Sequence, residues 1–223
     1  MNPMQKSSAT QGVRKPMSAA GLVGAAARAG MAAVLALVAV GAVHAKAEVG
    51  SAAPDFQVPG AAGGMVKLSD LKGRYVVLEW TNEGCPFVQK HYQGNMQGLQ
   101  KQFVGKNVEW LTVFSSAPGK QGHVDAAGAK KFQTDYDAKP TQLLLDESGE
   151  LGRLYQAKTT PHMYVIDPDG KLIYMGGIDD VPSADAADIP EATNYVQLAL
   201  GEALAGQPVS TPVSKPYGCS IKY

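Results

Sequence analysis

The sequence predicts an α/β protein in which helices flank a mixed central β-sheet. Three short apolar segments rich in β-branched residues are typical of buried strands, at residues 75–80, 108–114 and 142–146. Helical patterns separate them, and strands joined through a helix pair in parallel by right-handed crossovers. Pro168-Asp169-Gly170 is a strong turn signal between two further strands, which add an antiparallel hairpin to the same sheet. This order of elements predicts an α/β sandwich.

The first 45 residues have the layout of a secretory signal peptide. Their charged residues are all basic (Lys6, Arg14, Lys15 and Arg28), and the apolar run AGMAAVLALVAVGAV follows at residues 29–43. Small residues allow cleavage after Ala45 or Ala47. The run is shorter than the ~20 residues that span a bilayer, so we expect cleavage rather than membrane anchoring. The sequence therefore predicts export to the periplasm or the medium, with a soluble mature protein.

The exported part has the size of one domain. We expect a domain at residues 48–206 and an extended tail at residues 207–223, rich in proline and serine. Removing the four basic leader residues leaves 16 basic and 20 acidic side chains, a net charge of about −4. With no basic run, the composition excludes nucleic acid as an expected partner.

The remaining elements follow in chain order. Short strands are expected at residues 56–58 and 65–68 around the turn PGAAGG, followed by one helical turn at 69–73. One amphipathic helix is expected to begin at Pro86 and continue to Phe103, since apolar residues recur there at three- to five-residue steps. The other elements are helices at 124–136, 148–155 and 194–204 and hairpin strands at 163–167 and 171–175.

The stretch EGCPFVQKHY places Cys85 between a strand and a helix. Pro86 suits the first helical turn, and the free N–H groups of a helix N-terminus favour a thiolate, which is the reactive form of cysteine. Thr81, Asn82 and the amides after Gly84 are candidate hydrogen-bond donors to the sulfur. The position three residues after Cys85, where a C-x-x-C pair has its second cysteine, is Val88. An inert cysteine under an apolar lid is the competing interpretation.

Cys219, in the tail, is the other cysteine of the chain. Three roles stay open for it. It could resolve an oxidised Cys85, within the chain or across a homodimer. It could form a permanent disulfide with Cys85, which an oxidising compartment permits, or it could be a separate thiol.

Several segments in this order resemble the thioredoxin superfamily, and most closely its redoxin branch, the alkyl hydroperoxide reductase C/thiol-specific antioxidant proteins. They are APDF, VKLSDLKG, YVVLEWTNEGCPF, TTPHMYVIDPDGKLIY and YGCSIKY. The resemblance spans roughly residues 54–204 and implies a thioredoxin-like sandwich. It also implies that Cys85 is the nucleophilic or peroxidatic cysteine and that Pro161, between Thr160 and His162, is the cis-proline facing it.

The chain departs from the peroxiredoxin pattern at three positions. Peroxiredoxins have proline seven residues and threonine or serine three residues before the cysteine, where this chain has Leu78 and Asn82. They also have an arginine on the strand where this chain has Pro161. Since these features help to polarise a peroxide, the sequence leaves both a peroxide and a disulfide open as substrates.

Two further side chains have more than one interpretation. His162 follows Pro161 and is expected to lie near Cys85 and tune its pKa. A metal site of Cys85, His91 and His162 is the weaker alternative, because their spacing is loose. Glu79 lies mid-strand, where a carboxylate is costly to bury. It could relay protons to the cysteine or point outward at a sheet edge.

The sequence thus predicts an exported thiol-dependent oxidoreductase that requires no cofactor and no metal. Cys85 attacks a peroxide or a disulfide, and Cys219 or an external thiol reductant resolves it. The alternative function is a non-catalytic binding module with a structural Cys85–Cys219 disulfide.

Overall fold

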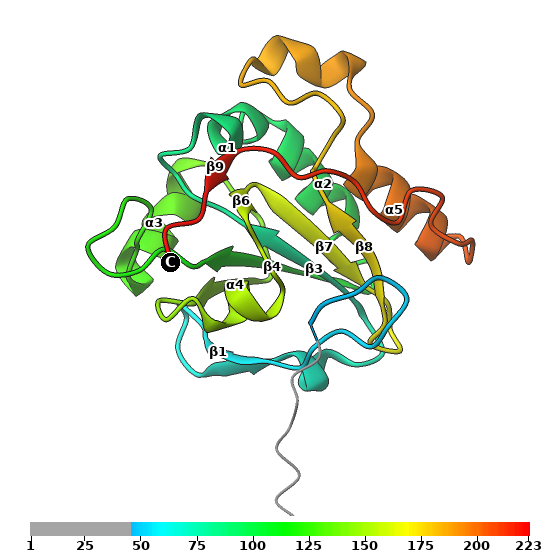
Figure 1. Ribbon diagram of the computed structural model, residues 1–223, viewed down its shortest axis with the longest axis horizontal. Helices are drawn as coiled ribbons and strands as arrows, with labels where there is room; N and C mark the ends of the chain where they lie inside the picture. The colour runs from blue at the N-terminus through cyan, green and yellow to red at the C-terminus, as the bar shows by residue number, and fades with distance from the viewer. Residues whose placement is uncertain (1–45) are drawn as a thin grey trace, which may run out of the picture. The chain divides into compact units, whose positions relative to one another are not determined.

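A five-stranded sheet forms the centre of the fold in the computed structural model, which describes residues 46–223 (Figure 1). Its strands lie in the order β5 (Gln142–Leu145), β4 (Val108–Phe114), β3 (Tyr75–Trp80), β7 (His162–Ile166) and β8 (Leu172–Gly176). The three helix-linked strands are parallel, and β7 and β8 run antiparallel to their neighbours. The predicted mixed sheet is therefore confirmed.

Each face of the sheet is covered by its own set of elements. One face packs against α1 (Pro86–His91), α2 (Asn95–Phe103), α3 (Ala126–Asp135) and α5 (Tyr195–Leu204). The other packs against α4 (Glu150–Leu154), the 3-10 helix η1 (Leu68–Leu71) and strand β1 (Gln57–Pro59), which pairs with β2 (Met65–Lys67). Because side chains alternate along a strand, neighbouring positions of β3 enter different layers: Val77 faces α1 and α2, and Leu78 faces the α4 side.

The helix expected from Pro86 to Phe103 is two helices. α1 ends at His91, and Gly94 has φ of 120° immediately before α2 begins. Glycine is the residue that adopts this backbone conformation without steric cost, and the chain changes direction there. The prediction of one continuous helix was therefore wrong, although its apolar residues do face the core as expected.

Three short elements were not predicted. They are the 3-10 helix η2 (Ala186–Glu191) and the two-residue strands β6 (Thr159–Thr160) and β9 (Cys219–Ser220). β6 and β9 pair antiparallel, and β9 belongs to the tail. Elements this short have no hydrophobic period that a sequence pattern could reveal.

The tail is extended, as expected, and lies against the domain. In Figure 1 it runs past β8 and α1, and its last residue, Tyr223, packs on Arg153 of α4. Val213 bridges to Met175, Cys219 pairs with Thr160, and the Ala117 N–H donates to the Lys222 carbonyl at 2.8 Å. The tail is therefore fastened at several points on both sides of Cys219.

The predicted signal peptide lies outside the described residues. Within residues 46–223 no helix is long and apolar enough to cross a membrane.

Candidate functional site

Cys85 occupies the junction between the β3 loop and α1. It is the N-cap residue of α1, and Pro86 follows as a first-turn residue, as predicted. Its backbone N–H donates to the Asn82 carbonyl at 3.0 Å, which closes a tight turn. The side chain has an exposed fraction of 0% and its Sγ donates to the Thr160 carbonyl oxygen at 3.1 Å. The thiol therefore lies at the N-terminus of a helix and under cover.

Cys219 lies directly against Cys85. Both are free thiols, and Cys219 packs against the core cluster that contains Cys85. Strand pairing aligns Cys219 with Thr160, whose carbonyl receives the Cys85 hydrogen bond. Gly218 makes this approach possible: a Cβ at that position would lie 2.0 Å from the Thr160 oxygen. The structure thus brings together two cysteines that are 134 positions apart in the sequence.

The two thiols have opposite pKa shifts. Burial acts to raise the pKa of Cys85, but the Cys219 thiol, the Val88 and Cys219 backbone N–H groups and the Thr160 hydroxyl favour the thiolate, and the net pKa is lowered. Burial and the neighbouring Cys85 raise the pKa of Cys219 to about 11. This asymmetry favours the thiolate form at Cys85 and the protonated form at Cys219.

The Thr160–Pro161 peptide bond is cis. It stands between β6 and β7, so that Thr160 pairs with the tail while His162 pairs with Trp80 of β3. Pro161 therefore lies where Cys85, the tail and the central sheet meet.

Comparison with protein families matches residues 49–175 to the AhpC/TSA family. The chain belongs to this family. Thiol-disulfide oxidoreductase ResA from Bacillus thuringiensis subsp. konkukian (strain 97-27) is 30% identical over 128 residues, 57% of this chain and 69% of that protein. Peroxiredoxin Bcp from Bacillus subtilis (strain 168) is 42% identical over 53 residues, 20% of this chain and 34% of that protein.

Two solved structures extend the likeness over most of the chain. An uncharacterized conserved protein from Geobacillus kaustophilus has 28% identity and a TM-score of 0.65, covering 79% of this chain and 92% of its own. A hypothetical protein from Sinorhizobium meliloti 1021 shares the fold, with a TM-score of 0.67 at 20% identity over 80% and 96% of the two chains. The predicted family and fold are confirmed, and the relatives' names agree with the prediction of a thiol-dependent oxidoreductase.

The side chains of Asn82 and Thr81 make no hydrogen bond to the Cys85 sulfur, and only Asn82 supports the loop before it. Asn82 Oδ1 accepts from the Gly84 N–H at 3.0 Å, and its amide makes two hydrogen bonds of 2.9 Å with Gln121. Thr81 is buried, and its Oγ1 has no hydrogen-bond partner among residues 46–223. The expectation that these side chains donate to Cys85 is not met: Asn82 links its own loop to Gln121 instead, and the Thr81 hydroxyl makes no hydrogen bond among the described residues.

His162 does not lie beside Cys85. Its ring packs on Tyr164 at 4.6 Å and its Nδ1 accepts from the Lys158 N–H at 3.3 Å, whereas Met163 faces the layer that holds Cys85. Burial, with a smaller effect of Lys158, lowers the pKa of His162 to about 3. Strand alternation explains the difference: adjacent residues of β7 point to opposite faces. The expectation that His162 tunes the cysteine was wrong.

Glu79 is fully buried beneath the site, in the central strand. Trp110, Tyr92, Thr112 and Gln100 donate hydrogen bonds to its carboxylate. Burial raises its pKa to about 7, although these donors act to lower it. The interpretation of an outward side chain at a sheet edge is therefore excluded. Tyr92 joins this cluster to the end of α1, the helix that begins after Cys85.

A second buried cluster was missed by the sequence reasoning. Tyr217 of the tail contacts Asp179, His91 and Lys90. The signal available in the sequence was a pair of polar residues, Lys90-His91, on the inner side of a short helix. Within residues 46–223 no group of three or more metal-binding side chains is arranged to hold a metal ion.

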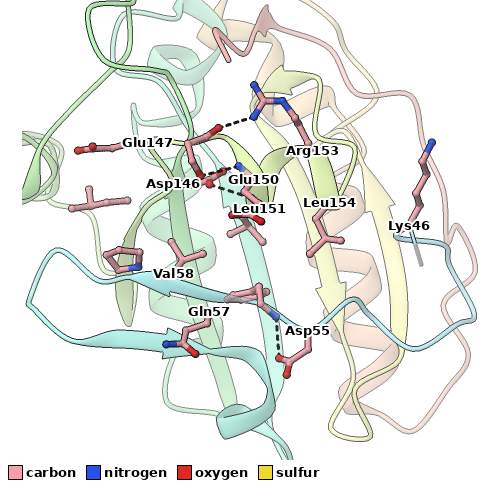
Figure 2. Close-up of a pocket in the computed structure, with 14 residues that line it drawn as sticks. Lys46, Asp55, Gln57, Val58, Asp146, Glu147, Glu150, Leu151, Arg153 and Leu154 are labelled. Carbon is pink, nitrogen blue, oxygen red and sulfur yellow. Dashed lines mark hydrogen bonds between the residues drawn. The ribbon is translucent and has the colours of Figure 1, made fainter. Parts of the chain in front are cut away.

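A large cavity among the described residues lies away from the two cysteines. A cleft of about 880 Å³ opens between β1 and α4, lined by residues such as Asp55, Asp146 and Arg153 (Figure 2). Its lining includes neither cysteine, and Asp146 is used there as an acceptor for the Leu151 and Gly152 N–H groups. The cleft is thus separate from the thiol site.

Proposed function

We propose that the chain is a thiol-disulfide oxidoreductase in which Cys85 is the nucleophile and Cys219 is the resolving thiol. The single observation that carries this proposal is that both cysteines contact Thr160 at the N-terminus of α1: the Cys85 thiol donates to its carbonyl oxygen, and Cys219 pairs with it across β6 and β9. Thr160 and Pro161 form the opposite wall. Since the contact lies within one chain, the resolving step needs no dimer.

The proposed reaction is two successive exchanges. The Cys85 thiolate attacks one sulfur of a substrate disulfide, which breaks its S–S bond and releases one substrate thiol. Cys219 then loses its proton and attacks the Cys85 sulfur of the mixed disulfide. The second substrate thiol leaves, and a Cys85–Cys219 disulfide remains. An external thiol reductant returns the pair to the reduced state.

A disulfide fits the site better than a peroxide does. Leu78 points into the layer opposite Cys85, Asn82 is engaged with Gln121, and the family resemblance aligns Pro161 with the peroxidase arginine. A peroxide bound at Cys85 would therefore lack the groups that polarise it in peroxiredoxins. Peroxide reduction stays the second candidate because of the AhpC/TSA match.

Oxidised glutathione tests the proposal. Reduced protein is mixed with it, quenched with N-ethylmaleimide and analysed by mass spectrometry. We expect two equivalents of released glutathione and a Cys85–Cys219 bond. Cys85→Ser should not react, and Cys219→Ser should stop with one glutathione bound at Cys85. Equal reactivity of wild type and Cys85→Ser would contradict the proposal, as would a Cys85–Cys219 bond that excess glutathione never reduces, since this would indicate the structural disulfide.

Hydrogen peroxide separates the second candidate. One equivalent added to the reduced protein should oxidise Cys85 more slowly than oxidised glutathione does. A faster peroxide reaction would favour the peroxidase function.

We also propose export, on the strength of the N-terminal sequence. Expression of the full chain in a bacterium, followed by fractionation and N-terminal analysis, should give a protein beginning at Lys46 or Glu48 outside the cytoplasm. An uncleaved cytoplasmic protein would overturn it.

A further inference from the structure

A chain of hydrogen-bonded side chains connects α5 to the tail. Asn194 is the N-cap of α5, and its Oδ1 accepts from the Gln197 backbone N–H at 2.9 Å. A backbone N–H can act only as a donor, so the amide nitrogen of Asn194 must face away and donate to Asn95 Oδ1, at 3.2 Å. The Asn95 amide nitrogen in turn donates to His91 Nδ1, at 2.8 Å.

This sequence of donors fixes the proton on His91. Its Nδ1 accepts, so in the neutral ring Nε2 carries the proton and donates to the Tyr217 hydroxyl oxygen at 3.0 Å. Burial, with a smaller effect of Lys90, lowers the pKa of His91 to about 3, so the ring is neutral near pH 7. Tyr217 then donates its own proton to Asp179 Oδ1. We call this chain of hydrogen bonds the relay; it passes from Asn194 through Asn95, His91 and Tyr217 to Asp179. Every donor in it points the same way, and it ends on the Asp179 carboxylate.

Asp179 is held by the elements around it. Its Oδ1 also accepts from the Val181 N–H at 3.1 Å, and its Oδ2 lies 3.7 Å from Lys90 Nζ. Lys90 donates to the Val181 carbonyl at 3.0 Å, and the side chains of both Lys90 and Asp179 are almost fully buried. A hydrogen bond to a charged group in such a low-dielectric site is stronger than one at the surface. Tyr217 is therefore attached to a buried ion pair formed by Lys90 of α1 and Asp179 of the segment after β8.

Tyr217 stands two residues before Cys219. Its ring makes an edge contact with Phe87 of α1, with centroids 5.7 Å apart. Cys219 pairs with Thr160, whose carbonyl oxygen accepts from the Cys85 thiol, so the tail forms part of the cover over a thiol with no exposed surface. An external disulfide can reach Cys85 only when this cover moves, whereas the resolving step requires it to be in place.

We propose that Tyr217 is the positioning residue for Cys219, and that its hydroxyl holds the tail closed over Cys85 through the relay that ends on Asp179. The proposal rests on the proposed function and deepens it, because it assigns the control of both exchange steps to one hydroxyl. Opening the tail admits the substrate disulfide to Cys85. Closing it returns Cys219 to the sulfur that it attacks.

The variant Tyr217→Phe tests this assignment, because it removes the hydroxyl and keeps the ring against Phe87. Its effects on the two steps should have opposite signs. With oxidised glutathione as the oxidant, attack by Cys85 should become faster, and alkylation of Cys85 by iodoacetamide should rise with it. The second step should become slower by about tenfold, as expected for losing a hydrogen bond to a charged group. Cys85 carrying one glutathione should therefore accumulate in the variant.

Tyr75→Phe is the matched control, since the Tyr75 hydroxyl donates to the Ala203 carbonyl at 2.9 Å and has no contact with the relay. Both steps should keep their wild-type rates in it. Asn95→Ala breaks the relay without changing a residue of the tail. As in Tyr217→Phe, the attack by Cys85 should become faster and the second step slower, but by a smaller factor. Thermal unfolding of each variant establishes that all are folded at the assay temperature.

The outcomes separate this proposal from the proposed function. If wild type forms the Cys85–Cys219 bond and Tyr217→Phe does so with both rates unchanged, or with both changed in the same direction, the positioning role is overturned while the function stands. If wild type forms no such bond with oxidised glutathione, the function itself fails.

Discussion

The Cys85 segment and the C-terminal tail meet at one site but are held by different kinds of contact. The Cys85 segment is built mainly from neighbours in the sequence: the Asn82 carbonyl, the Gly84 N–H and the first turn of α1. The tail has no hydrophobic period and depends on partners far along the chain. Tyr217 bonds His91, 126 positions away, and Asp179, 38 positions away.

Each region also has its own buried carboxylate. Glu79 lies under the Cys85 segment and receives hydrogen bonds from four neutral donors. Asp179 lies under the tail and is paired with Lys90. A carboxylate with neutral donors can be accommodated by taking up a proton, whereas removing the cation from a buried ion pair leaves an uncompensated charge. The two regions should therefore respond differently to mutation and to pH.

Lys90→Met should give the largest effect, because it leaves the Asp179 charge buried without its cation. We expect the free energy of unfolding to fall by about 3–5 kcal/mol. Urea unfolding at pH 7 measures it. Arg74→Met is the matched control: the Arg74 side chain is 52% exposed, and its pair with Glu109 should contribute at most about 1 kcal/mol. If Lys90→Met and Arg74→Met lost equal free energy of unfolding, the buried ion pair under the tail would be no more important than a surface pair.

Glu79→Gln should change how stability depends on pH. The pKa of Glu79 is raised from 4.5 to about 7, so between these values the folded protein binds a proton that the unfolded chain has lost. Wild-type stability therefore contains a contribution that is present at pH 4.5 and is lost as pH rises toward 7. At about 1.4 kcal/mol per unit of pKa, this contribution is on the order of 3 kcal/mol.

Comparing wild type with Glu79→Gln isolates the contribution of the Glu79 proton to stability. The pKa values of His91 and His162 are lowered from 6.5, so these two residues make the protein less stable as pH falls below 6.5. This effect is the same in wild type and in Glu79→Gln, so it cancels when the two are compared. Urea unfolding from pH 5 to 8 should show the variant gaining stability relative to wild type up to pH 7 and then staying level. Parallel curves would mean that Glu79 is ionised throughout the range.

Gln121→Ala should give the smallest effect, because the Cys85 loop keeps its backbone contacts. The change removes two hydrogen bonds to Asn82, but Asn82 still accepts from the Gly84 N–H. We expect a loss of about 1 kcal/mol in the free energy of unfolding. Gln89→Ala, which removes an exposed hydrogen bond to the Glu83 carbonyl, is the reference. A loss above that of Lys90→Met would show that the loop depends on long-range contacts after all.

The same contrast explains what could be predicted from the sequence. The strands around Cys85 and its place before Pro86 follow from local patterns, and the structure has β3 and β4 at the predicted bounds. The break at Gly94 was missed because apolar spacing continues across it. His162 was misplaced because nearness to Pro161 in sequence was taken for nearness in space, although alternation on β7 assigns His162 and Met163 to different faces.

The tail shows the limit of local patterns. Cys219 was a candidate partner for Cys85 because it is the second cysteine, but no spacing rule placed it opposite Thr160. The Tyr217–Asp179 contact joins a tail to a segment after β8, and such a contact depends on how the whole domain folds. The sequence indicated the chemistry of the site, and the fold supplies the position of its second thiol.

Redox titration tests most directly whether Cys85 and Cys219 are a reversible pair. The protein is equilibrated in buffers of varied reduced-to-oxidised glutathione ratio, quenched in acid and mapped by peptide mass spectrometry. We predict one intramolecular Cys85–Cys219 disulfide whose fraction changes reversibly with the ratio and is absent in Cys219→Ser. Free thiols or glutathione adducts at every ratio, without that bond, would contradict the account.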